Sequence, residues 1–426
     1  MKVIRANTAD RGLQAALTEL NKQGNFIETA SRNGPVRRFR GPATIMWTRP
    51  QHRVSFDPLR DANPAFHLFE SLWMLSGEND VERPKYFASA MGAFSDDGIT
   101  FNGAYGHRWV NHFGGDQIRE YVIPALRKNP EDRRVVLQMW DGDHDMKSAL
   151  AASKDVPCNL GCTFDAAQGD GRLHLNVFNR SNDLVWGATG ANVVQFSMLQ
   201  EYVASACGMG IGVYEQISTN SHLYLELNEV SKKMLAVNIE DPNRDLPYAG
   251  HLSFLKDKSD GTPEEWQTKF DADIALLMVH YKDVGAVRFQ TKFFREVVYP
   301  VIGAFNLYKN GDELEAAMYL LLQKNSKTSF EEPWYTWSDW SIATYQWLER
   351  RVKNRNSLAK KALEAKDETE FETVVKKMWT KATRMGDTFV IPGASRPVKA
   401  ALDPHRMVKY RGMTAENMPD AIKSEE

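Results

Sequence analysis

The hydrophobic positions along this chain follow two periods, one typical of helices and one typical of strands. Apolar residues recur at helical spacing over residues 9–24, 64–77 and 193–207. In the last two stretches they occupy most of the helix surface, which predicts helices that are buried on nearly every side. Residues 264–385 are also mostly helical in pattern. The chain is therefore expected to contain several core helices and a helical C-terminal part.

Strand patterns lie between the second and third of these helices. Residues 134–140 form an apolar, β-branched run that predicts a buried strand. Residues 160–164 alternate in side-chain size, and the alternation resumes over residues 173–177 after a glycine-rich turn. We therefore expect a hairpin that has Cys158 at its entrance and Arg180 at its exit.

Composition excludes several classes of protein. The 426 residues are 42% hydrophobic and 25% charged, and the net charge of -2 provides no global field that would recruit nucleic acid or an anionic membrane. No segment approaches the roughly 20 apolar residues of a membrane span, and the N-terminus lacks the apolar core of a secretory signal. Three cysteines are too few for a disulfide framework. We expect a cytoplasmic protein without a metal site.

One stretch combines a nucleophile with anion-binding groups. The cysteine of Val156-Pro157-Cys158-Asn159 can add as a thiolate to an electron-poor ring carbon and leave again. Arg180 offers a planar fork of donors to a phosphate dianion, and the Ser181 hydroxyl adds another donor. These residues predict a phosphorylated substrate with a reactive ring.

Further along the chain, polar side chains suit a nucleoside. Asn192 carries a donor beside an acceptor, which matches the N3 and O4 edge of uracil, or the edge of cytosine if the amide is flipped. His222 and Tyr224, two apart on an extended segment, point the same way and can both reach a ribose hydroxyl. The alternative for Asn192 is a helix cap, and for Glu70 in the second helix it is a position turned outward to solvent.

These residues resemble the thymidylate synthase family, which includes the pyrimidine nucleotide hydroxymethylases. The resemblance covers roughly residues 25–235 in the family's order. It also includes the segment Phe69-Glu70-Ser71-Leu72-Trp73-Met74-Leu75-Ser76-Gly77, the pair Tyr105-Gly106 and the run Asp132-Arg133-Arg134. The resemblance implies an α+β fold with a large mixed β-sheet packed with helices. The helical pattern of residues 264–385, where the resemblance has faded, adds a mostly helical C-terminal extension. The expected regions are a catalytic core (1–255), the helical extension (256–385) and a loosely structured tail (386–426).

The resemblance also implies a reaction and its participants. Cys158 would add to C6 of a deoxynucleoside monophosphate, so that C5 attacks the one-carbon unit of 5,10-methylenetetrahydrofolate. The remaining catalytic roles would fall to Glu70, Tyr105, Asn192 and Asp183. Folate contacts would come from Glu70, Trp73, Asp183 and Gly187. The substrate would be held by Arg32, Arg180, Ser181, Asn192, His222 and Tyr224, with Arg133 and Arg134 crossing from the other subunit of a homodimer.

Three departures from the family's pattern concern the outcome of the reaction. Asn159 stands where thymidylate synthases generally have His, the stretch 187–192 is one residue longer than usual, and no tryptophan occurs between Val81 and Arg108. Tight closure excludes water, which is the nucleophile that competes with hydride transfer. We expect methylation of deoxyuridylate, with hydroxymethylation of deoxyuridylate or deoxycytidylate as the alternative. A nucleotide-binding module without catalysis and an unrelated cysteine hydrolase are the other classes considered.

Overall fold

The computed structural model describes residues 1–166, 169–236, 254–310, 338–363, 388–390 and 397–399. Its largest sheet has six strands in the order β1-β4-β9-β7-β6-β5, with β1 parallel to β4, β7 parallel to β9 and the other pairs antiparallel. The strands are β1 (Lys2–Ala6), β4 (Ala43–Trp47), β5 (Val136–Gln138), β6 (Asn159–Asp165), β7 (Arg172–Asn179) and β9 (Gly210–Ser218). The expected α+β fold with a large mixed sheet is confirmed.

A second sheet of four strands has the order β2-β3-β10-β8. Its strands are β2 (Phe26–Thr29), β3 (Val36–Phe39), β8 (Asn182–Asp183) and β10 (Ser221–Tyr224). Ser31 and Gly34 exchange backbone hydrogen bonds of 3.1 and 3.2 Å in the turn between β2 and β3. The parallel pairing of β10 with β8 places His222 beside Asp183. This sheet therefore groups several of the predicted substrate-binding residues.

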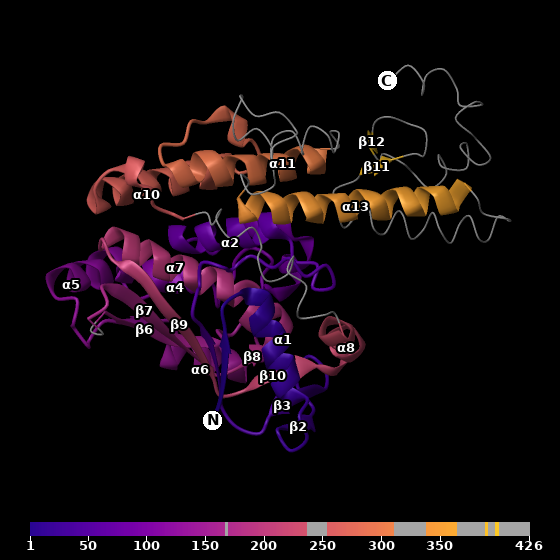
Figure 1. Cartoon of the computed structure of the whole chain (residues 1–426), viewed down its shortest axis with the longest axis horizontal. Helices are drawn as coiled ribbons and strands as arrows, with labels where there is room; N and C mark the ends of the chain where they lie inside the picture. Colours follow the sequence, from indigo (N-terminus) through magenta and orange to yellow (C-terminus); the bar gives the residue numbers. More distant parts are fainter. Residues whose placement is uncertain (167–168, 237–253, 311–337, 364–387, 391–396, 400–426) are drawn as a thin grey trace.

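Helices cover one face of the large sheet (Figure 1). They include α1 (Ala9–Leu20) and α7 (Asn192–Ala206), with α2 (Pro64–Ser76) and α4 (Tyr105–Val110) farther from the strands. Trp47 of β4 stacks on Tyr214 of β9 with ring centroids 4.9 Å apart, and Phe196 of α7 lies 6.4 Å from Tyr214. All three side chains are fully buried. Aromatic packing thus joins the helical layer to the sheet.

Local signals define the ends of α2. The Asn63 side chain accepts a hydrogen bond from the Phe66 amide, and Pro64 occupies the first turn, where its missing N–H is not needed. Gly77 ends the helix with φ of 81°, a left-handed conformation that favours glycine. Every residue from 64 to 75 is buried. The predicted helix over 64–77 is confirmed.

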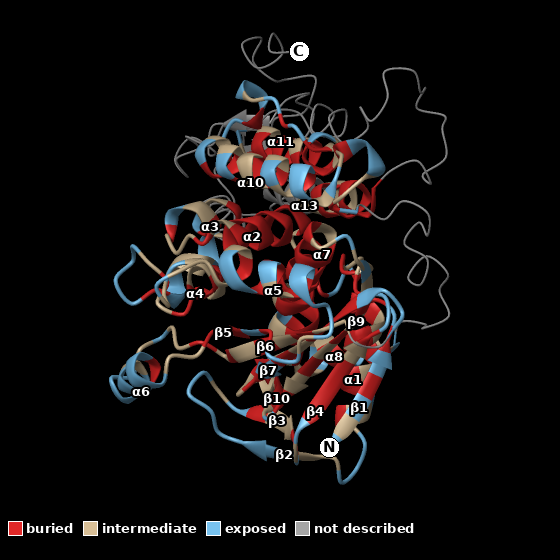
Figure 2. Ribbon diagram, turned by 90° about the vertical axis from the view of Figure 1, so that its left-hand side faces the viewer, coloured by how far each residue is buried: buried red, intermediate tan, exposed pale blue. Residues whose placement is uncertain are grey.

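A further helical layer explains why α2 is buried so completely. Helices α10 (Pro263–His280), α11 (Tyr299–Asn310) and α13 (Asp339–Leu363) lie on the side of α2 that faces away from the sheet (Figures 1 and 2). Trp340 and Trp347 of α13 are buried, and the Trp347 ring lies 6.2 Å from Phe305 of α11. These two indoles therefore pack between helices. The predicted tail 386–426 lies almost entirely outside the described residues.

The remaining elements differ from expectation mainly at their ends. The predicted strand over 134–140 is shortened to β5, and α7 begins at Asn192 because a π-helical segment, η3 (Leu184–Ala191), leads directly into it. No helix among the described residues is both long and apolar enough to cross a membrane. The other elements are α3 (Glu82–Phe87), η1 (Ser89–Phe94), η2 (Gln117–Val122), α5 (Ile123–Lys128), α6 (Gly142–Leu150), η4 (Leu225–Leu227), α8 (Asn228–Ala236), η5 (Lys258–Asp260), η6 (Val284–Ala286), η7 (Phe294–Val298), β11 (Thr388–Val390) and β12 (Pro397–Lys399).

Candidate active site

A cavity of about 780 Å³ gathers most of the residues that the sequence singles out. Helices α2 and α7 supply one side of its lining, and strand ends and loops supply the other. The predicted residues that line it are Arg32, Glu70, Trp73, Tyr105, Cys158, Arg180, Ser181, Asn192, His222 and Tyr224. Asp183, Gly187, Arg133 and Arg134 do not line it.

Cys158 lies at the entrance of β6, and two arginines hold the segment before it. Arg180 donates from Nε to the Pro157 carbonyl at 2.8 Å and from Nη2 to the Val156 carbonyl at 2.9 Å. Arg32 donates to the Ser153 and Lys154 carbonyls at 2.5 and 2.9 Å. Burial raises the pKa of the Cys158 thiol, and the positive charges of Arg180 and Arg32 offset part of that rise. The arginines therefore influence both the position and the ionisation of the nucleophile.

Glu70 is buried against α7 and does not turn outward to solvent, so the solvent-facing alternative is wrong. Its Oε2 accepts a hydrogen bond of 2.8 Å from Nε2 of Gln195, which also lines the cavity. Burial raises the pKa of Glu70 to about 7, and the Gln195 hydrogen bond acts in the opposite direction. A carboxyl group with this pKa can take up and release protons near neutral pH.

Asn192 does not cap α7, so the capping alternative is also wrong. Its Nδ2 donates to Oδ1 of Asn182 at 3.2 Å, and Nδ2 of Asn182 lies 3.4 Å from the Ser218 hydroxyl. A Cβ atom at Gly187 would come within 2.5 Å of the same Asn182 oxygen. Gly187 thus leaves space for the amide that orients Asn192. Its predicted contact with folate stays a prediction.

Asp183 adjoins the cavity residues without lining the cavity. One carboxylate oxygen accepts a hydrogen bond from the Trp186 amide at the start of η3, and the other is buried without a hydrogen-bond partner among the described residues. Burial raises the pKa of Asp183, and the charges of His222 and Arg60 oppose that effect. The structure leaves one acceptor available here, and the predicted pterin contact stays a prediction.

The proposed ribose pair lies on β10. The His222 and Tyr224 rings meet edge to face with centroids 5.2 Å apart, and both residues line the cavity. Nδ1 of His222 lies 3.3 Å from the Asn220 carbonyl oxygen, which fixes the ring. A hydrogen bond joins Tyr224 to Asn33 in the turn between β2 and β3. The turn that carries Arg32 is thereby tied to the ribose pair.

Tyr105 opens α4 and reaches the nucleophile. Its hydroxyl group is hydrogen-bonded to the backbone of Cys158, and burial raises the pKa of this hydroxyl, so it stays protonated near neutral pH. The next residue, Gly106, packs directly on α2, because a Cβ atom there would lie 2.2 Å from the Met74 carbonyl oxygen. The Tyr-Gly pair therefore combines a cavity residue with a close contact between two helix backbones.

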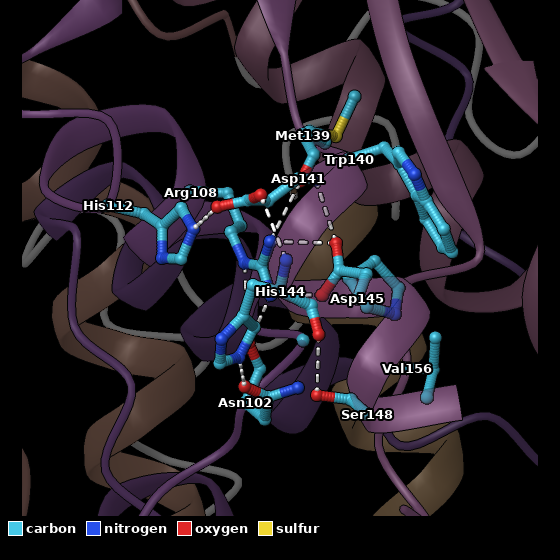
Figure 3. Close-up of polar contacts among 12 residues, drawn as sticks. Asn102, Arg108, His112, Met139, Trp140, Asp141, His144, Asp145, Ser148 and Val156 are labelled. Atoms are coloured by element: carbon cyan, nitrogen blue, oxygen red, sulfur yellow. Dashed lines mark hydrogen bonds and ion pairs between the residues drawn. The ribbon is translucent and has the colours of Figure 1, made fainter. Parts of the chain in front are cut away.

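A buried ion pair supports the wall around Trp140 (Figure 3). Arg108 binds both carboxylate oxygens of Asp145 at 2.7 and 2.9 Å, and neither side chain is exposed. The same guanidinium donates to the carbonyls of Asn102 and Met139 at 2.9 and 3.2 Å. The sequence pattern did not reveal this pair, because its members are 37 residues apart.

Arg133 and Arg134 are exposed on the surface. Arg134 pairs with the neighbouring Asp132 at 2.7 Å, and its side chain is 88% exposed. Within one chain this is the surface ion pair that is common for adjacent arginines. Neither residue lines the cavity of its own chain, so their predicted role depends on a second subunit. Among the described residues, no group of three or more His, Cys, Asp or Glu side chains could hold a metal ion.

Comparison with known proteins places this site in a class. The family model described as thymidylate synthase matches residues 58–253. The chain belongs to the thymidylate synthase family, whose members transfer a folate-borne one-carbon unit to C5 of a pyrimidine nucleotide. The resemblance seen in the sequence is thereby confirmed.

Three similar proteins are named deoxyuridylate hydroxymethyltransferase. The protein of this name from Pseudomonas phage M6 is 43% identical over 360 residues, which cover 82% of this chain and 95% of that protein. The one from Bacillus phage SP01 is 36% identical over 53% of this chain and 60% of its own length, and the one from Delftia phage PhiW-14 is 31% identical over 42% and 50%. These names support the hydroxymethylation alternative better than the methylation that we expected first.

Proposed function

We propose that this chain hydroxymethylates C5 of deoxyuridylate with 5,10-methylenetetrahydrofolate and water, which gives 5-hydroxymethyldeoxyuridylate and tetrahydrofolate. The observation that carries the proposal is the 43% identity to the Pseudomonas phage M6 protein. That match spans 360 residues, so it must extend beyond the region of the family model and include part of the C-terminal helical layer. A shared catalytic core alone would not produce it.

The cavity provides a nucleophile and a charge stabiliser for this reaction. Addition of the Cys158 thiolate to C6 turns C5 into a carbon nucleophile, and negative charge develops on O4 of the ring. The Asn192 amide can donate a hydrogen bond to that oxygen, whereas a carboxylate at the same position would repel it. Because Asn182 accepts one N–H of Asn192, the other N–H and the amide oxygen remain for the base. This arrangement supports uracil as the base.

The walls of the cavity favour water over hydride as the final donor. Hydride transfer requires the folate ring to be held against the pyrimidine while water is excluded. In the stretch where thymidylate synthases place indoles, this chain contributes Phe94 and Phe101, and the Phe94 side chain is 54% exposed. Trp73 is present in the cavity, but its indole nitrogen donates to Asp80 at 3.0 Å and the ring is fixed against Phe101. An open aromatic wall admits water to the reacting carbon.

Product analysis by mass spectrometry tests the proposal. The protein is incubated with methylenetetrahydrofolate and either deoxyuridylate or deoxycytidylate, with Cys158→Ala as the control. The expected result is a hydroxymethylated uracil nucleotide together with tetrahydrofolate. A methylated nucleotide with dihydrofolate would establish the thymidylate synthase reaction instead. Absence of product from both bases would favour a binding module without catalysis.

A homodimer is part of the proposed function, because Arg133 and Arg134 do not line the cavity of their own chain. The face of the large sheet opposite α1 and α7 carries partly exposed apolar side chains, including Val3 and Val136 at 53% and 57% exposure. Mixing Cys158→Ala protein with Arg133→Ala/Arg134→Ala protein tests the crossing. Hybrid dimers with one complete site should recover activity that neither parent has. Mixtures as inactive as their parents would refute the shared site.

A further inference from the structure

Gln195 lines the cavity but has not yet been given a role in the proposed reaction. It lies on α7 one turn after Asn192, and its side chain is only 4% exposed. Residues three apart on a helix share a face, so Gln195 and Asn192 line the same cavity. Asn192 is proposed to hold the base, and Gln195 therefore lies beside the position of the reacting ring.

The two ends of the Gln195 amide differ in their bonding. The Nε2 end donates a hydrogen bond of 2.8 Å to the Glu70 carboxylate. The Oε1 end is buried and has no hydrogen-bond partner among them. Burial of a carbonyl oxygen without a hydrogen-bond partner is energetically unfavourable. A buried acceptor in a cavity wall is therefore expected to bind a donor from a ligand or from water.

We propose that Gln195 binds the water that completes the reaction: its Oε1 accepts a hydrogen bond from this water while its Nε2 holds the Glu70 carboxylate that deprotonates it. The inference rests on the proposed function. After tetrahydrofolate leaves, the substrate carries an exocyclic methylene at C5. The water oxygen forms a bond to this methylene, the water proton passes to Glu70, and the electron pair of the double bond moves onto the C4–O4 enolate. Collapse of the enolate then breaks the C6–S bond and releases the Cys158 thiolate.

The two ends of the Gln195 amide bring the water and the Glu70 carboxylate close together. A general base must lie within hydrogen-bond reach of the proton that it takes. Because Gln195 contacts Glu70 directly, a water on its other end is placed next to that base. Donation from Nε2 also favours the ionised form of Glu70, which is the form that accepts a proton.

Partitioning of the methylene intermediate between two nucleophiles tests the proposal. Wild-type protein and Gln195→Leu are supplied with 5-tritiated deoxyuridylate, methylenetetrahydrofolate and 2-mercaptoethanol as a competing thiol. Tritium release measures bond formation at C5, and the ratio of thioether to hydroxymethyl product measures use of the bound water. In Gln195→Leu, tritium release should persist while this ratio rises at least about tenfold, the effect of losing about one hydrogen bond.

Two further variants separate the proposed role from a structural one. Gln195→Glu keeps an oxygen acceptor but loses the donor to Glu70. Its product ratio should therefore stay near that of the wild type, whereas the pH below which its rate falls should move upward. Gln200→Leu removes another buried amide of α7, one that donates to the Leu173 carbonyl and does not line the cavity. It should change neither the ratio nor the pH profile.

The product of the wild-type protein tests the proposed function, and the product ratio of Gln195→Leu tests the role of Gln195. A methylated product from the wild-type protein would refute hydroxymethylation, and the water-binding role with it. A hydroxymethylating wild type with an unchanged product ratio in Gln195→Leu would overturn only the assignment to Gln195. Should Gln195→Leu fail to fold, Gln195→Met takes its place, because methionine is close to glutamine in length and also lacks the oxygen acceptor. The same rise in the product ratio is expected, and an unchanged ratio would overturn the assignment.

Discussion

The two sides of the cavity are built from different kinds of structure. The helical side consists of α2 and α7, where Glu70, Asn192 and Gln195 are buried and bonded to other side chains. The loop side consists of strand ends and connecting segments, where Arg32 and Arg180 bind backbone carbonyls and remain partly exposed. Proton transfer needs a fixed, desolvated environment, whereas capture of a charged substrate needs access to solvent. Proton transfer by Glu70 is therefore expected to depend on the helical side, whereas capture of the nucleotide depends on the loop side, which also carries the nucleophile Cys158.

The largest effect is expected at the nucleophile, Cys158, which lies at the entrance of β6. Cys158→Ala removes the covalent bond to C6, so that C5 is never activated. Turnover should fall by at least about 10⁴-fold, as it does when a nucleophile is deleted. Tritium release from 5-tritiated deoxyuridylate measures the loss. Binding of deoxyuridylate by calorimetry should persist, and retained tritium release would refute the assignment of Cys158.

A variant on the helical side should reduce the rate and leave substrate capture unchanged. Glu70→Gln removes the proton acceptor, so kcat should fall about 10² to 10⁴-fold with little change in KM for deoxyuridylate. The wild-type rate should rise with pH through about 7 as Glu70 ionises, and the variant should lack this limb. A pH profile that is the same in both proteins would show that Glu70 is not the group that titrates.

Glu70→Gln should lower the rate without lowering the stability of the folded protein at alkaline pH. Burial raises the pKa of Glu70 from 4.5 to about 7, so the folded state binds more protons than the unfolded state between these values. The contribution of Glu70 to stability is therefore lost as pH rises through this window. Glu70→Gln should be at least as stable as the wild type at pH 8 in thermal unfolding. A large loss of stability there would indicate that the low rate reflects misfolding.

The sequence predicts local elements such as helix α2 well, but it does not predict contacts between residues that are far apart in the chain. Helix α2 was predicted closely because its cap, its proline and its terminal glycine are local signals. Strand β5 is shorter than predicted, because the run over 134–140 continues past the paired residues toward Trp140 at the cavity. Gln195 was missed because its partner Glu70 is 125 residues away, and only the fold brings them together. Its spacing from Asn192 was the one signal available in the sequence.

The contact between α2 and α4 supports the helical side and can be tested by adding one methyl group. In Gly106→Ala the new Cβ would lie 2.2 to 2.6 Å from backbone atoms of Met74, which cannot move without shifting α2. Overpacking of this kind should lower the free energy of unfolding by about 1–3 kcal/mol. Urea denaturation measures the change. Gly142→Ala is the matched control, because nothing lies within 4 Å of a Cβ at that position.

A smaller and different effect is expected on the loop side. Arg180→Lys keeps the positive charge but loses the planar fork that binds the Val156 and Pro157 carbonyls. The sequence also predicts that this fork binds the phosphate. KM for deoxyuridylate should rise roughly tenfold with a much smaller change in kcat, since lysine is a poorer bidentate donor. Arg127→Lys is the control, because Arg127 binds the Ala206 carbonyl and does not line the cavity.

Thiol reactivity then separates the charge of Arg180 from its geometry. That charge offsets part of the rise that burial causes in the pKa of Cys158. The pH at which iodoacetamide begins to alkylate Cys158 should therefore stay near its wild-type value in Arg180→Lys and move upward in Arg180→Gln. If both variants shift equally, position and not charge controls the thiol. If Arg180→Lys lowers kcat as strongly as Glu70→Gln, then Arg180 acts mainly on the nucleophile, and substrate capture is not its main role.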